Sequence, residues 1–191
     1  MLKNILITGG ARSGKSCFAY KLALKLGEPV LFVATAVAGD EEMRHRIEEH
    51  QQARPAAWST LEATTDIGSQ ITQKIGRAKV VIIDCITLLV SNIFSQYSDQ
   101  ASEQIDALLI EQKVTNEISK LVECINHADA SFIIVTNEVG LGLVPANRVG
   151  RLYRDLLGRA NQMLAEHADE IYLMVAGIPV QIKPAKDNST G

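Results

Sequence analysis

The chain has 191 residues and a mass of 20.8 kDa, with 47% hydrophobic and 21% charged residues. These values favour a single globular domain, which we expect over residues 1–183, followed by a flexible tail at 184–191. The formal net charge of -3 supplies no broad positive field for a nucleic-acid backbone, and no apolar run approaches the ~18 residues that cross a bilayer. We therefore expect no nucleic-acid partner and no membrane span.

The cysteine pattern points to a reduced compartment. The residues Cys17, Cys85 and Cys124 are odd in number, far apart and without a CxxC pair. The first residues also lack the long apolar core and the small-residue cleavage site of a secretory signal. We expect a cytoplasmic protein.

The predicted elements alternate between strand and helix along the chain. Short runs that are apolar on both faces predict buried parallel strands, and longer segments with helical spacing lie between them. In chain order these are a strand at 5–8, a helix at 15–26, a strand at 30–34, a helix at 41–52, strands at 80–84 and 132–136 separated by a helix at 102–128, a helix at 150–168 and a strand at 171–175. The alternation predicts an α/β fold, with a mostly parallel sheet, helices on both faces and ligands at the carboxyl ends of the strands. The polar stretch 91–102 is predicted to be an irregular connection, either a surface loop or a mobile flap.

Residues 9–16 match the pattern G-x-x-x-x-G-K-[ST] between a predicted strand and a predicted helix. The glycines let backbone N–H groups turn toward phosphate oxygens, while the lysine neutralises terminal phosphates and the serine can bind Mg²⁺. The pattern in this context predicts a P-loop NTPase with a RecA-like fold that binds ATP or GTP through Gly9, Gly10, Ala11, Arg12, Ser13, Gly14, Lys15 and Ser16. A glycine-rich turn that binds nothing is the alternative.

A second carboxylate-bearing strand completes the expected metal site. Asp84 ends the apolar run 80–84, where its carboxylate can hold the hydration shell of Mg²⁺. A helix cap is the alternative role for Asp84. We expect Mg²⁺ as the cofactor, bound by Ser16 and Asp84.

The charged segment 40–50 predicts an exposed helix with Asp40 as its N-cap. It carries His45 and His50, which are five residues apart and therefore lie about 140° apart around a helix. That spacing does not match the i, i+4 pair of a helical metal site. Spacing alone leaves His50 open between a catalytic group and a solvent-facing or capping side chain.

Several segments together resemble one enzyme family. They are residues 8–16, residues 34–36, the pattern D-x-E-M-x-x-R-I-x-x-H at 40–50, the pattern R-P-x-x-W-x-T-x-E at 54–62, and the later segments 136–145 and 147–162. The family is the bifunctional adenosylcobinamide kinase/adenosylcobinamide-phosphate guanylyltransferase of cobalamin biosynthesis, and the resemblance spans about residues 4–182.

The resemblance implies a transferase with two activities. It would phosphorylate adenosylcobinamide with ATP or GTP, and it would transfer GMP from GTP through a histidine to adenosylcobinamide phosphate, giving adenosylcobinamide-GDP. The histidine position of the family is His50 here, which would be catalytic together with Lys15. The resemblance also implies a homo-oligomer, namely a homotrimer with sites between subunits. It places the guanine nucleotide around Ala34, Thr35, Ala36, Arg54, Glu62 and Asp84.

Alternative interpretations remain for several of these residues. By itself, Glu62 is a solvated surface acid, although its carboxylate can accept hydrogen bonds from a guanine edge, and Arg54 is a helix-end cation before Pro55. Arg148, Arg151 and Arg154 recur every third residue and form either a phosphate site or a solvated face.

The glycine-containing run 137–145 is predicted to be either a substrate-side loop or a tight structural turn. Two other functions also stay open: another small-molecule P-loop kinase in which His50 is structural, and a P-loop regulatory or motor ATPase.

Overall fold

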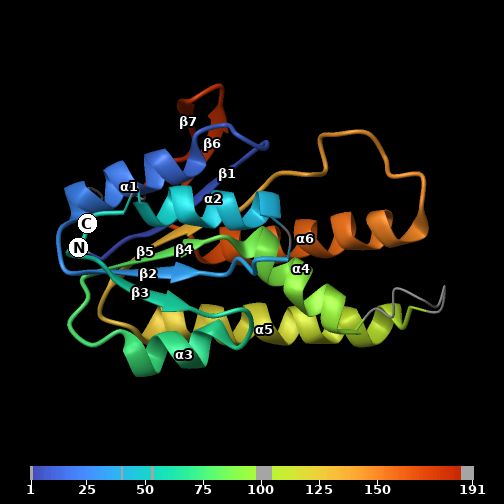
Figure 1. The fold of residues 1–191 in the computed structure, drawn as a ribbon, viewed down its shortest axis with the longest axis horizontal. Coiled ribbons are helices and arrows are strands. Elements are labelled where there is room, and N and C mark those ends of the chain that lie inside the picture. The colour runs from blue at the N-terminus through green and yellow to red at the C-terminus, as the bar shows by residue number, and fades with distance from the viewer. Residues whose placement is uncertain (1, 40, 53, 98–104, 186–191) are drawn as a thin grey trace, which may run out of the picture.

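The computed structural model describes residues 2–39, 41–52, 54–97 and 105–185 (Figure 1). Its helices pack around one central sheet. The strands run in the order β3-β2-β4-β5-β1-β6-β7. All neighbours are parallel except β6 and β7, which are antiparallel. Their bounds are β1 (Asn4–Gly9), β2 (Val30–Ala34), β3 (Ser59–Glu62), β4 (Val80–Asp84), β5 (Ser131–Val135), β6 (Glu170–Val175) and β7 (Ile178–Lys183). The predicted α/β fold with a mostly parallel sheet is confirmed.

Helices cover both faces of this sheet, with α1 and α2 above it and α3 and α5 below it in Figure 1. Alternate residues of the central strands explain this: Phe32 and Ile82 belong to the core cluster on the α1 side, whereas Val33 and Ile83 belong to the cluster that α3 to α6 build on the other face. The helices are α1 (Lys15–Leu26), α2 (Glu41–Gln52), α3 (Ile67–Lys74), α4 (Ile86–Tyr97), α5 (Ala107–His127) and α6 (Arg148–His167).

The prediction of an irregular connection at 91–102 was wrong for residues 91–97, which belong to α4. Apolar side chains at helical spacing, including Leu89, Val90 and Ile93, are buried against the helices on that face and stabilise the helix. Residues 98–102 lie outside the described residues. Three further elements, β3, α3 and β7, were not predicted, and β7 had no burial signal because its residues 178–182 are exposed.

Caps decide where the last two long helices begin. The Asp106 carboxylate accepts a hydrogen bond from Leu109 N (3.0 Å), so α5 begins at Ala107. The Asn147 side chain accepts one from Gly150 N (2.6 Å), so α6 begins at Arg148, two residues earlier than the predicted 150. The predicted start of the first of these helices at Ser102, the predicted cap Asp40 and the tail beyond residue 185 lie outside the described residues.

Candidate functional site

Backbone geometry restricts two positions of the phosphate loop to glycine. Gly9 has φ +145, and a Cβ atom there would lie 2.6 Å from the carbonyl oxygen of Met174 in β6. Gly14 has φ +93, and a Cβ atom there would lie 3.2 Å from Gly177 Cα at the β6–β7 turn. The Gly177 N–H also donates to Ser13 O (3.0 Å), which ties this turn to the loop. The loop therefore holds its shape through contacts with the far end of the chain.

Lys15 lies inside the loop rather than in solvent. Its side chain donates to Gly9 O (3.1 Å) and Gly10 O (2.6 Å), and the residue is 8% exposed. Burial lowers the pKa of Lys15, and the neighbouring Cys85 and Asp84 oppose that shift. Two neutral carbonyls thus hold the ammonium, and a phosphate oxygen can replace them.

The sheet order brings the other predicted nucleotide-binding positions to the same edge. Ala34 pairs with Asp84 on one side and with Glu62 on the other, at the carboxyl ends of β2, β4 and β3. The adjacent Ala36 is half-buried. Because β5 separates β4 from β1, Asp84 and the phosphate loop flank one strand. This is the edge at which α/β sheets bind ligands.

Thr35 has a structural role that the sequence did not reveal. Its hydroxyl donates to Cys85 O (2.7 Å) and accepts from Cys85 N (2.8 Å), and the residue is fully buried. Asn92 in α4 donates to Thr35 O (2.8 Å) and to Thr64 O (3.1 Å). Thr35 therefore fixes the chain that follows Asp84, and its hydroxyl already has partners within the protein.

Arg54 belongs to an aromatic cluster on the α1 side. Its guanidinium carbon lies 3.8 Å from the centroid of the Phe32 ring, and Tyr20 packs edge-on against both Phe32 (5.8 Å) and Trp58 (5.5 Å). Burial raises the pKa of Tyr20, Asp84 adds to the rise, and Arg54 opposes it. The cluster therefore lies within electrostatic reach of Asp84. Sequence reasoning missed Tyr20, for which no motif or spacing gave a signal.

The helix that carries His50 ends near Glu62. The neighbouring Gln51 donates to Glu62 Oε1 (3.4 Å), and Glu62 is exposed. His45 is exposed and pairs with Glu48 (3.8 Å) on the same helix. The side chain of His50 lies outside the described residues, so only its place in α2, one residue before Gln51, is given.

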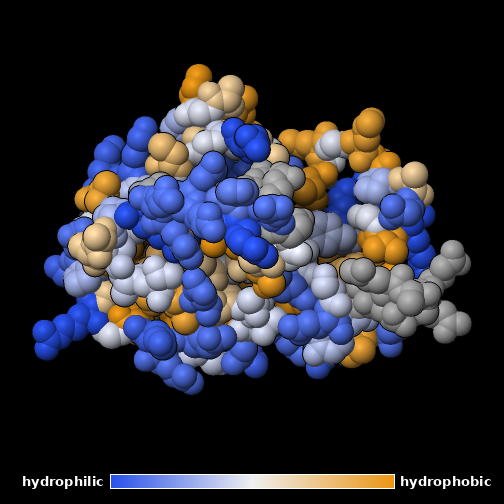
Figure 2. Space-filling view, in the orientation of Figure 1, coloured by the Kyte–Doolittle hydropathy of each residue, from blue (hydrophilic) through white to orange (hydrophobic). Residues whose placement is uncertain are grey.

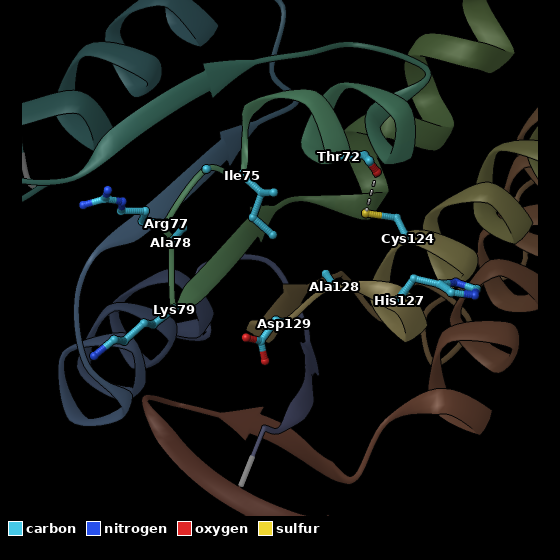
Figure 3. A pocket seen from close by; sticks show the side chains of 10 residues that line it. Thr72, Ile75, Arg77, Ala78, Lys79, Cys124, His127, Ala128 and Asp129 are labelled. Carbon is cyan, nitrogen blue, oxygen red and sulfur yellow. Dashed lines mark hydrogen bonds between the residues drawn. The ribbon is translucent and has the colours of Figure 1, made fainter.

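A separate cavity of about 480 Å³ lies away from this edge (Figure 3). Ile75, Lys79, Cys124 and Asp129 are among its lining residues, and the Thr72 hydroxyl donates to Cys124 Sγ (3.5 Å). Lys79 and Asp129 precede β4 and β5, so the cavity lies at the amino ends of the strands. It shares no residue with the phosphate loop.

The described residues contain neither a membrane-spanning helix nor a clustered metal site. No helix in this part of the chain is long and apolar enough to cross a membrane. Among the same residues, no group of three or more His, Cys, Asp or Glu side chains is placed to hold a metal ion.

The family model for cobinamide kinase / cobinamide phosphate guanyltransferase matches residues 5–182, nearly the whole chain. The chain belongs to this family of transferases. It is 42% identical over 180 residues to the bifunctional adenosylcobalamin biosynthesis protein CobU of Escherichia coli, covering 94% of this chain and 99% of the relative. It is 37% identical over 180 residues to the corresponding protein CobP of Pseudomonas aeruginosa, covering 93% and 96%. The resemblance drawn from the motifs is confirmed, and with it a bifunctional kinase and guanylyltransferase of cobalamin biosynthesis.

Solved structures support the fold. The RadB recombinase aligns with a TM-score of 0.50 and 14% identity over 90% of this chain and 73% of that one. An ATPase from the type III secretion system of pathogenic bacteria aligns with a TM-score of 0.54 and 12% identity over 90% of this chain and 50% of that one. At such low identity these similarities concern the fold alone, and they confirm the predicted RecA-like fold.

Proposed function

We propose that the chain catalyses two successive transfers at the carboxyl edge of its sheet. In the first, adenosylcobinamide is phosphorylated by ATP or GTP; in the second, GMP passes from GTP through His50 to adenosylcobinamide phosphate, giving adenosylcobinamide-GDP. The observation that carries the proposal is the position of Lys15, which is buried inside the phosphate loop and beside Asp84.

In the kinase step, a hydroxyl oxygen of adenosylcobinamide attacks the γ-phosphorus. The bond from that phosphorus to the β,γ-bridging oxygen breaks, the nucleoside diphosphate leaves, and the hydroxyl proton passes to solvent. Lys15 and the loop N–H groups would stabilise the charge on the phosphate oxygens. Because contacts with the β6–β7 turn already support the shape of the loop, little rearrangement of the protein would be needed at this step.

Ser16 and Asp84 would hold Mg²⁺ with the nucleotide phosphates. Both are half-buried oxygen donors, Ser16 in the first turn of α1 and Asp84 at the end of β4. Magnesium usually keeps several waters and takes one or two carboxylates together with phosphates, so this donor set fits it. The ion would supply positive charge that offsets the phosphates.

In the transferase step, a ring nitrogen of His50 attacks the α-phosphorus of GTP and the bond to the β-phosphate oxygen breaks, releasing pyrophosphate. A phosphate oxygen of adenosylcobinamide phosphate then attacks the histidine-bound phosphorus. The nitrogen–phosphorus bond breaks, the product is released and the imidazole is restored. The contact between Gln51 and Glu62 supports this role, because it places the end of α2 at the same strand edge.

The nucleotide itself would lie along Ala34, Thr35, Ala36 and Arg54, with Glu62 accepting hydrogen bonds from the guanine edge. The hydroxyl of Thr35 is bound to Cys85, so this residue would contact the nucleotide through its backbone. The Arg54 guanidinium, held against Phe32, would present charge toward the phosphates.

Labelling with GTP that carries the label on its α-phosphate tests the transferase mechanism. The wild type should retain acid-labile, base-stable label, and His50→Ala should abolish it while leaving kinase activity partly intact. The control His45→Ala should keep the label, because His45 lies about 140° from His50 around the helix. Label that persists in His50→Ala and disappears in His45→Ala would identify a different nucleophile. A wild type that never labels would leave a simple kinase.

The proposal extends to assembly and location. We propose a homotrimer with sites between subunits, for which sedimentation under active conditions should give three times the protomer mass; a stable, active monomer would contradict it.

All three cysteines are free thiols, which supports a cytoplasmic location. We also propose that residues 1–183 fold as one catalytic domain, which a truncation after residue 183 should leave active.

A further inference from the structure

The connection between β5 and α6 exposes large apolar side chains. This β5–α6 loop, residues 138–147, projects beyond the body of the molecule as the orange arc in Figure 1 and forms an apolar patch at the upper right of Figure 2. In it, Leu141 is 83% exposed, Leu143 97% and Val144 65%. Three neighbouring apolar side chains in solvent indicate an interaction site rather than chance exposure.

The loop is anchored at its first residues. Glu138 N donates to Gly9 O in the phosphate loop (3.1 Å), and Asn137 N donates to the Thr87 hydroxyl (2.7 Å). Asn161 in α6 accepts from the Thr136 hydroxyl (2.7 Å) and donates to Asn137 O (3.1 Å). The loop therefore starts from a fixed point beside the phosphate loop.

The loop is also anchored at its far end. There Arg151 donates to Pro145 O (3.0 Å) and Ala146 O (2.7 Å), and at the near end Val139 packs against the core beneath the sheet. Because both ends of the loop are held, the backbone between them is supported where it presents its leucines to solvent. Preorganisation of this kind lowers the entropic cost of binding.

The position of the loop indicates which kind of ligand it would bind. It leaves β5, which lies between β1 with the phosphate loop and β4 with Asp84, so its first residues lie beside the place where a phosphoryl group would be transferred. The N-terminus of α6, with Arg148 as its first residue, adds positive charge at the far end of the loop. An occupant should therefore combine a large apolar surface with a hydroxyl or phosphate that reaches the phosphate loop.

We propose that the β5–α6 loop binds the corrinoid acceptor, with Leu141, Leu143 and Val144 packed against the macrocycle. The inference rests on the proposed function, because that function names adenosylcobinamide as the acceptor. A corrin ring presents broad methyl-substituted surfaces that can pack against apolar side chains. A polar nucleotide would gain little from contact with three exposed apolar side chains. One acceptor skeleton serves both transfers, so this surface acts in the kinase step and in the transferase step alike.

The test is the double variant Leu141→Ser/Leu143→Ser, assayed as an intact protein. The KM for adenosylcobinamide should rise at least about tenfold, equivalent to ~1.4 kcal/mol. The KM for GTP, the extent of labelling by α-labelled GTP and the sedimenting mass should all match the wild type. Leu143→Met, which keeps an apolar side chain, should retain the wild-type KM for the corrinoid. The matched control is Leu24→Ser, which removes an exposed leucine (55%) from the far end of α1 and should change none of these values.

Two results with the variant would overturn the inference. An unchanged KM for the corrinoid would show that the loop does not bind it. A reduced sedimenting mass would show that the leucines instead contact a second copy of the chain. Failure of the proposed function looks different: the wild type itself would fail to label with GTP or to phosphorylate the corrinoid, and the loop assignment would fall with it.

Discussion

Replacing Thr35 by valine tests how the structure holds the end of β4 in place. The buried Thr35 hydroxyl has two partners on one residue, Cys85 O (2.7 Å) and Cys85 N (2.8 Å). Valine fills nearly the same volume, so the change leaves almost no cavity, but it leaves the buried Cys85 N–H without this partner and removes one of the two bonds to Cys85 O, which keeps its bond from Leu89 N (3.2 Å). The N–H without a partner costs about 1–3 kcal/mol and the lost bond to Cys85 O costs about 1 kcal/mol, so we expect Thr35→Val to lower the free energy of unfolding by about 2–4 kcal/mol.

Urea unfolding at a fixed protomer concentration measures this loss, because association would otherwise shift the transition. The midpoint should fall with an unchanged slope. The control Thr35→Ser retains the hydroxyl and loses one methyl group, a cost of about 1 kcal/mol. Since Asp84 directly precedes Cys85, kcat of the kinase step should also fall more in the valine variant than in the serine variant. Equal midpoints for the two variants would refute the reasoning.

Three further predictions concern Lys15, Glu117 and Glu170. Lys15→Ala should reduce both transfers by at least about 100-fold, and turnover close to wild type would contradict the P-loop assignment. The buried Glu117 accepts from the backbone N–H groups that open α3 (2.8 Å each), so Glu117→Gln should cost about 1–3 kcal/mol in urea unfolding, whereas an unchanged midpoint would contradict this. Burial opposes ionisation of Glu170, but hydrogen bonds from Lys3 and Tyr172 prevail and hold its pKa below the ordinary 4.5. This contribution to stability is present above pH 4.5 and is lost as the pH falls through the folded-state pKa, so the Tm difference between wild type and Glu170→Gln should shrink toward acid pH. A difference that stays constant would rule out the linkage.

Local patterns in the sequence were sufficient for the central strands and the phosphate loop. Residues 30–34 and 80–84 are apolar on both faces, and the structure has β2 and β4 with those bounds. The loop could be predicted because glycine spacing, the lysine and the following helix lie within a few residues of one another. The order of motifs also identified the family. Such signals survive in the sequence because the interactions that produce them are between near neighbours.

The elements without such signals had to come from the structure. The helix α4 begins only one residue after β4. In the sequence, its first apolar residues therefore resembled a continuation of the strand, and its later polar residues resembled a loop. The strand β7 is exposed, and its pairing with β6 depends on backbone bonds that any side chain allows. Local periodicity reports which face is buried, and it reports little where an element has no buried face.

The sequence by itself determined the phosphate loop, the central strands and the family, whereas only the tertiary structure decided which distant residues meet at the site. Thr35 bonds to a residue 50 positions away. Arg54 meets Phe32 and Tyr20 through the packing of three segments. The contact of Thr35 with Cys85 exists because β4 pairs with β2, a choice of strand order that depends on burying both faces of the whole sheet at once. No short stretch of sequence carries that choice, since the central strands β1, β2, β4 and β5 are similarly apolar and each could pair with several others.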